Sequence, residues 1–102
     1  MRPPYAEYVK FAMRSYLARE MNGCPESEIG VVALEKNWLA CNSAFQSFNE
    51  DERLILKEVY GSYDTMPDNV YQAAKRRNVP QNDVWQTINR FESEFARLRG
   101  LI

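Results

Sequence analysis

Histidine is absent from the chain, and cysteine occurs only at Cys24 and Cys41. Without histidine the protein lacks the usual general base and the Ser-His or Cys-His pair of nucleophilic catalysis, so we expect no enzyme. Two distant cysteines cannot supply the four closely spaced soft ligands of a structural zinc, and we expect no metal and no cofactor. A Cys24–Cys41 disulfide stays open as an alternative, although a reducing cytoplasm favours two free thiols.

Long apolar runs are also missing. No segment approaches the roughly 20 residues needed to cross a bilayer, and the opening MRPPYAEY has no apolar region of a signal peptide. Hydrophobic residues nevertheless make up 45% of the chain and aromatic residues 13%, which argues for a real core and against intrinsic disorder. We therefore expect one soluble, cytoplasmic domain over residues 1–102, with no membrane partner.

An excess of positive charge, which is typical of nucleic-acid-binding proteins, is missing as well, because the net charge is −1. The charges are unevenly spread, however. Residues 1–70 hold seven Lys/Arg and eleven Asp/Glu, a balance of −4, whereas residues 71–102 hold six and three, a balance of +3. Salt screens charges beyond about 8–10 Å, so a basic C-terminal segment can still attract phosphates, weakly in a monomer.

The N-terminal part, residues 1–48, predicts a hairpin of two helices. The first begins at Pro3 or Pro4 and ends at Gly23, and its apolar residues cover more than one face. This indicates either a helix inside the core or a contact with a second copy of the protein. The second begins at Pro25 or Ser27 and carries the longest apolar stripe, which is a core spine or a dimer seam. The stripe consists of Val31, Leu34, Trp38, Cys41, Phe45 and Phe48.

The C-terminal part, residues 49–102, predicts three more helices. Asn49 and Glu52 have the spacing of a capping box, and Asn78 suits a left-handed corner. The expected helices start at Glu50, at Thr65 or Asp68, and at Pro80 or Gln81, and they end at Gly61, Arg77 and Gly100. The predicted fold is thus all-α with about five helices, a C-terminal helix-turn-helix packing on the N-terminal helical hairpin.

The second helix of this helix-turn-helix, residues 81–98, has two distinct faces. One is an apolar stripe spaced by four, three and four positions, made of Val84, Ile88, Phe91 and Phe95. The other face holds Gln81, Asn82, Trp85, Gln86, Asn89 and Arg90. If the stripe is buried, the second face is free, and amides exposed on such a helix are typical of base recognition in a DNA major groove.

Two groups of side chains are the expected nucleic-acid contacts. Carboxamides bridge adenine N6 and N7, unless they are ordinary solvated residues; these are Gln81, Asn82, Gln86 and Asn89. Basic residues contact phosphates, unless they only complement a helix dipole; these are Lys75, Arg76, Arg77 and Arg90. Trp85 has three alternatives: it contacts a thymine methyl, lies in a dimer interface, or packs under the N-terminal helix.

Residues 48–99 resemble region four of the sigma-70 family of RNA polymerase sigma factors. The phrase FNEDERLILKEVYG is similar to the family's L-P-x-x-E-R-x-(I/V)-L-x-x-x-Y-G helix, and AAKRRNVPQNDV is similar to its A-x-x-x-G-V-S-x-x-x-V turn. Asn78 replaces the glycine of that turn, and Pro80 replaces the serine. No segment resembles the promoter-melting region, so the likeness is to the small region-four-like regulators of phages and integrated elements. It implies binding to promoter DNA, contact with RNA polymerase, or both.

These observations lead to two hypotheses. The first is a sequence-specific transcriptional regulator of phage or mobile-element genes that binds double-stranded DNA as a homodimer. The second is a protein-interaction module that uses the helix-turn-helix to bind RNA polymerase or another protein, which the acidic N-terminal part and an exposed Trp85 favour.

Overall fold

Five α-helices make up the part of the chain that the structure, a computed structural model, describes: residues 2–22 and 32–102. They are α1 (Ala6–Asn22), α2 (Val32–Phe45), α3 (Glu50–Gly61), α4 (Met66–Arg77) and α5 (Gln81–Arg99). No strand occurs in these two ranges, and the prediction of an all-α fold is confirmed. The expected start of the second helix, together with Cys24 and Val31, falls outside the described residues.

Local chemistry sets the ends of the three C-terminal helices. The Asn49 side chain accepts from the Glu52 backbone N–H at 2.8 Å, and the Glu52 carboxylate accepts from the Asn49 N–H at 3.0 Å, which confirms the capping box. Thr65 is the N-cap of α4, since its hydroxyl accepts from the Asp68 N–H. Asn78 ends α4 in the left-handed conformation, at φ 55° and ψ 46°, and the chain turns there into α5.

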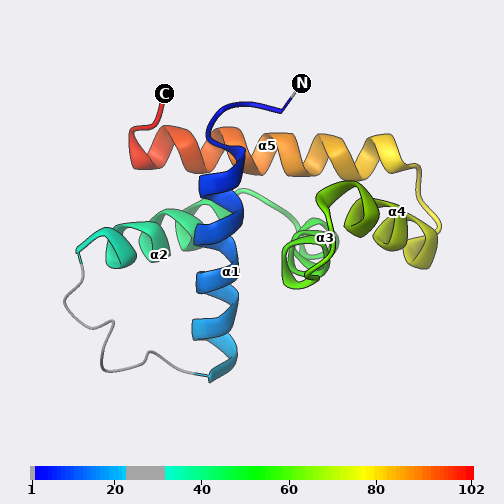
Figure 1. Cartoon of the computed structure of the whole chain (residues 1–102), viewed down its shortest axis with the longest axis horizontal. Helices are drawn as coiled ribbons and strands as arrows, with labels where there is room; N and C mark the ends of the chain where they lie inside the picture. Colours follow the sequence, from blue (N-terminus) through cyan, green and yellow to red (C-terminus); the bar gives the residue numbers. More distant parts are fainter. Residues whose placement is uncertain (1, 23–31) are drawn as a thin grey trace.

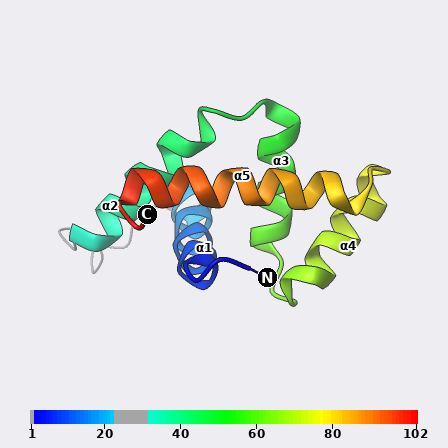
Figure 2. The same ribbon diagram turned by 90° about the horizontal axis from the view of Figure 1, so that it is seen from above.

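Helix α5 organises the molecule. In Figure 1 it runs along the long axis, and the other four helices all lie on one side of it. Figure 2 shows the same arrangement from above, with α5 in front of the others. Its buried face contacts each of α1, α2, α3 and α4. A single helix therefore presents one face to the whole core and leaves the opposite face uncovered by the other helices.

The core centres on the ring of Phe91. Its centroid lies 5.6 Å from that of Phe45, 5.9 Å from that of Tyr60 and 6.1 Å from that of Phe48. The sequence predicted that Phe48 belongs to the stripe of the second helix. Helix α2 instead ends at Phe45, and Phe48 reaches the core from the following turn. Such aromatic pairs add about 0.5–1.5 kcal/mol each beyond the area that they bury.

Helices α1 and α2 contact each other but cross, instead of lying antiparallel as the two arms of a hairpin (Figures 1 and 2). The crossing explains the broad apolar surface of α1. Val9 and Met13 are fully buried among the other helices, while Phe11 points outward and stays 60% exposed. Phe11 is therefore accessible to a second copy of the protein, and that contact stays a prediction.

Candidate nucleic-acid interface

The apolar stripe of α5 lies entirely in the core. Val84, Ile88, Phe91 and Phe95 each have 0% exposure. Fully burying four such side chains contributes about 1.5–3 kcal/mol apiece, far more than any surface contact of this helix, so the stripe fixes which way the helix faces. The side chains opposite the stripe are consequently held toward solvent.

Helix α5 carries the four predicted carboxamides, and all of them are exposed: Gln81, Asn82, Gln86 and Asn89. The last three lie opposite the stripe, and Gln81 is exposed in the first turn. Within the described residues, their side-chain amides make no hydrogen bond to another part of the chain. Each amide therefore keeps both a donor and an acceptor available for a ligand. The structure thus brings the predicted base-contacting residues together on one surface, which we call the amide face.

Arg90 adjoins the amide face but is engaged within the protein. Its Nη1 donates to the Glu52 carboxylate at 2.6 Å, and its guanidinium lies 4.8 Å from the centre of the Phe48 ring. The backbone N–H of Asn49 and the Arg90 guanidinium together lower the pKa of Glu52, so this carboxylate is ionised at neutral pH. Its negative charge offsets that of Arg90 for any phosphate that approaches.

The three basic residues at the end of α4 are also largely paired. Arg76 and Arg77 contact opposite oxygens of one carboxylate, Glu58, at 3.0 Å and 3.2 Å. Lys75 instead lies over the ring of Tyr71, with its Nζ 6.0 Å from the ring centre, and no carboxylate in the described chain pairs with it. Two arginines that share one carboxylate, together with Lys75, leave this corner of the helix-turn-helix positive.

A shallow groove lies at the same corner, and it separates the basic residues from the amide face. Its wall is formed by Tyr71 and Lys75 of α4 and by Gln81 at the start of α5. Pro80 precedes α5 and offers no side-chain cap, so the first N–H groups of α5 have no side-chain partner from it. Asp83, in the first turn, is instead favourably placed for the helix dipole.

Trp85 differs from the exposed amides because it is partly covered by the rest of the chain. It is half-buried and packs against the core, and the guanidinium of Arg2 covers its ring at 5.0 Å from the centre. Pro3 and Ala6 line the same hollow beside it, so Trp85 lies against the N-terminal segment and the start of α1. Only a part of the ring remains for a partner.

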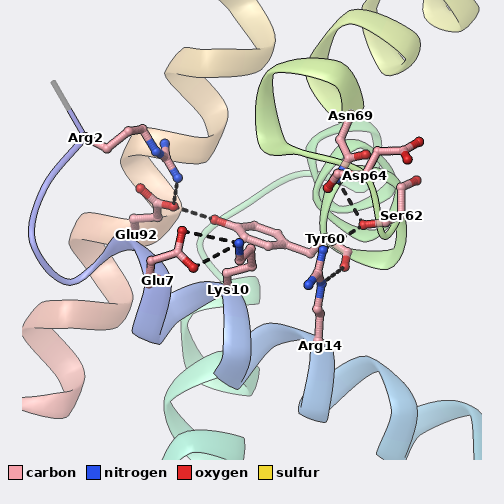
Figure 3. Close-up of polar contacts among 9 residues, drawn as sticks. All are labelled: Arg2, Glu7, Lys10, Arg14, Tyr60, Ser62, Asp64, Asn69 and Glu92. Atoms are coloured by element: carbon pink, nitrogen blue, oxygen red, sulfur yellow. Dashed lines mark hydrogen bonds and ion pairs between the residues drawn. The ribbon is translucent and has the colours of Figure 1, made fainter.

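Arg2 belongs to a buried polar cluster that the sequence did not reveal (Figure 3). Its Nη2 donates to Glu92 Oε2 at 2.5 Å, and the Tyr60 hydroxyl donates to the same oxygen at 2.9 Å. Glu92 has 0% exposure, and its Oε1 has no partner among the described residues. The cluster ties the N-terminal segment and α3 to α5. One signal was available, since Glu92 is four residues after Ile88 and so lies on the buried side.

Burial governs the ionisation of this cluster. Desolvation raises the pKa of Glu92 above its ordinary value of 4.5, although Arg2 and Tyr60 act in the opposite direction. Desolvation and the neighbouring carboxylate of Glu92 also raise the pKa of Tyr60 well above 10.0. The protonated, neutral form of Glu92 is therefore more favoured in this cluster than it would be in water.

A pH-dependent stability difference follows from the raised pKa of Glu92. The native state holds the proton of Glu92 at pH values where the unfolded chain has lost it, so Glu92 lowers stability progressively as pH rises above about 4.5. As pH rises from about 4.5 to the raised pKa of Glu92, we expect the free energy of unfolding of Glu92→Gln to increase relative to that of the native sequence. Urea unfolding at several pH values measures it.

Glu94 is the matched control on the same helix. Arg97 lowers the pKa of Glu94, so its contribution to stability is present above the unfolded pKa and is lost as pH falls. Glu94→Gln should accordingly show a trend of the opposite sign. Identical trends for the two variants would show that burial does not control Glu92.

Two further side chains in Figure 3 brace the helix-turn-helix. Arg14 of α1 donates to the backbone carbonyls of Tyr60 and Ser62 at 3.4 Å and 3.0 Å. The amide nitrogen of Asn69, which is 2% exposed, donates to the carbonyls of Val59, Ser62 and Asp64. Both satisfy carbonyls at the end of α3 and in the loop to α4, so they fix the position of α4 beneath α5.

Two observations on residues 2–22 and 32–102 concern metal ligands and the Cys41 thiol. No group of three or more Cys, Asp and Glu there could hold a metal ion. Cys41 is fully buried as a free thiol, and desolvation raises its pKa to about 12, so it stays protonated. In the same ranges, no helix has the length and apolar character that a bilayer-spanning helix requires.

Comparisons with protein-family models, with curated proteins and with solved structures find no match to this chain. The likeness to region four of sigma factors accordingly stays a prediction from the residues that carry it. Over the residues that the structure describes, it defines an all-α fold of five helices, with a turn between α4 and α5 and a face of α5 that the other helices leave uncovered.

Proposed function

We propose that this protein is a sequence-specific DNA-binding regulator of transcription, of the kind that acts on phage or mobile-element genes, and that α5 enters the major groove. The supporting observation is the amide face, with four exposed carboxamides on the helix whose apolar stripe is fully buried. Glutamine and asparagine recognise adenine by paired hydrogen bonds, each worth about 1–3 kcal/mol of discrimination. Gln81, Asn82, Gln86 and Asn89 are the proposed base contacts.

The proposed phosphate contacts are Lys75, Arg76, Arg77 and Arg90. Lys75 has no carboxylate partner in the described chain and is the most readily available of them, whereas the other three share Glu58 and Glu52. Because the net charge of the chain is −1, one copy has few phosphate contacts and weak affinity. A homodimer on two half-sites would double those contacts, so dimerisation on DNA belongs to the proposal.

The ion pairs favour a second candidate function. Glu52 and Glu58 neutralise part of the basic surface, and negative charge beside a phosphate contact weakens it. A surface of this kind also suits a protein partner, and contact with RNA polymerase through the helix-turn-helix is therefore the alternative. Co-purification with polymerase, in the absence of any binding to duplexes, would favour it.

Selection from random duplexes, followed by binding measurements at several salt concentrations, tests the proposal. We expect the selected duplex to bind with an affinity that falls steeply as salt rises, because counterions are released from phosphates. Absence of binding at low salt, or an affinity that does not respond to salt, would contradict it.

Gln86→Ala should reduce the preference for the selected duplex over a scrambled one by about tenfold, since one bidentate contact is lost. Gln72→Ala is the matched control, because Gln72 is an exposed glutamine of α4 to which the proposal gives no base contact. Lys75→Ala should weaken both duplexes alike and lower the salt dependence by about one counterion. Equal loss of preference in Gln86→Ala and Gln72→Ala would rule out base reading by Gln86.

A further inference from the structure

A second exposed surface lies at the far end of α5, where the helix packs on α2 (Figure 1). It is a groove whose apolar part consists of Leu39, Ala40 and Leu98, and whose rim carries Lys36, Arg97 and Arg99. Leu39 is 56% exposed and Leu98 is 40% exposed. Two large apolar side chains from different helices thus line one hollow together with three basic residues.

The positive charge of this rim is incompletely neutralised. Arg97 contacts the Glu94 carboxylate. Arg99 contacts only neutral groups in the described chain, the Asn37 side-chain oxygen at 2.6 Å and the Tyr8 hydroxyl at 3.1 Å. Lys36 is exposed and has no carboxylate partner there. The dipole of α5 accounts for cations in its own last turn, but Lys36 belongs to another helix.

The positive charge around this groove indicates which kind of partner fits it. A second copy placed symmetrically on this groove would bring like charges together, which disfavours association. The phosphates of a nucleic acid would meet the cations but leave the leucines without apolar partners. A segment that carries both apolar and acidic side chains matches both features, and an amphipathic helix presents them on one face.

We propose that this groove, which we call the α2–α5 groove, binds an acidic amphipathic helix of a partner protein. Apolar side chains of that helix would pack on Leu39 and Leu98, and its carboxylates would meet Lys36 and Arg99. Leu98 lies twelve positions after Gln86, roughly 18 Å along the helix, so a partner here leaves the amide face free. The inference does not depend on DNA binding.

A labelled peptide tests the proposal on the full chain. The probe is an amphipathic helix of about 16 residues, roughly four turns, with leucines along one face and glutamates beside them. We expect its fluorescence anisotropy to rise on binding, whereas a peptide with lysine in place of each glutamate should not bind. Leu98→Ser and Lys36→Glu should each weaken binding by roughly tenfold, since the first removes an apolar contact and the second reverses a charge on the rim.

Matched controls come from α3. Leu54, at 42% exposure, is as accessible as Leu98, and Lys57 is exposed like Lys36. Leu54→Ser and Lys57→Glu should bind the glutamate peptide as the native sequence does. No binding of the peptide, equal binding of the lysine peptide, or equal losses in the α3 variants would overturn the proposal. So would a duplex whose binding is lost in Leu98→Ser, because the groove would then be a nucleic-acid surface.

Discussion

Replacement of Phe91 by alanine is expected to lower the free energy of unfolding by about 3–5 kcal/mol, a large part of the 5–15 kcal/mol typical of a small domain. Phe91 has 0% exposure and lies within 6.4 Å, between ring centroids, of Phe45, Phe48, Tyr60 and Phe95. These rings come from α2, the turn after it, α3 and α5. Removal of the central ring leaves a cavity that those elements cannot all close at once.

Phe11 provides the control, because it is a phenylalanine that is 60% exposed on α1. Phe11→Ala should change the free energy of unfolding by no more than about 0.5 kcal/mol. Urea unfolding monitored by circular dichroism measures both variants. A loss of less than about 1 kcal/mol in Phe91→Ala would contradict a core centred on this ring.

Replacement of Asn69 by aspartate is expected to cost about 3–5 kcal/mol. The Asn69 amide nitrogen donates to three backbone carbonyls, at 2.9, 3.0 and 3.2 Å, and the side chain is buried. Aspartate has almost the same shape but no donor. Its charged oxygen would face those carbonyls, and the ends of α3 and α4 would lose their common partner.

Asn82→Asp is the isosteric control, since Asn82 is exposed in the first turn of α5, where a negative charge favours the helix dipole. This variant should be as stable as the native sequence or slightly more stable. Both variants change one amide to one carboxylate, so thermal unfolding compares a buried position with an exposed one. Equal stabilities would show that Asn69 does not brace the helix-turn-helix.

Rules that depend only on residues near one another in the sequence predicted much of the fold. The capping box of Asn49 and Glu52 spans four residues, and the left-handed corner at Asn78 depends on one residue. The period of the apolar stripe on α5 predicted which residues are buried. It thereby also predicted that Gln86 and Asn89 face solvent, which the structure confirms.

Contacts between residues far apart in the chain were beyond these rules. Arg2 meets Glu92 across ninety positions, and Arg90 meets Glu52 across thirty-eight. Nothing in the local pattern of either basic residue indicates its partner, because the packing of α1 and α3 on α5 brings them together. For the same reason, the charge count of residues 71–102 overestimated the positive charge available to phosphates.

The most direct measurement is an NMR titration of the ¹⁵N-labelled protein with a selected DNA duplex at low salt, which observes the side-chain amides themselves. We expect the NH₂ resonances of Gln81, Asn82, Gln86 and Asn89 to shift, while those of the buried Asn37 and Asn69 stay in place. Shifts confined to residues around the α2–α5 groove, or no shifts on the amide face at saturating duplex, would contradict DNA recognition by α5.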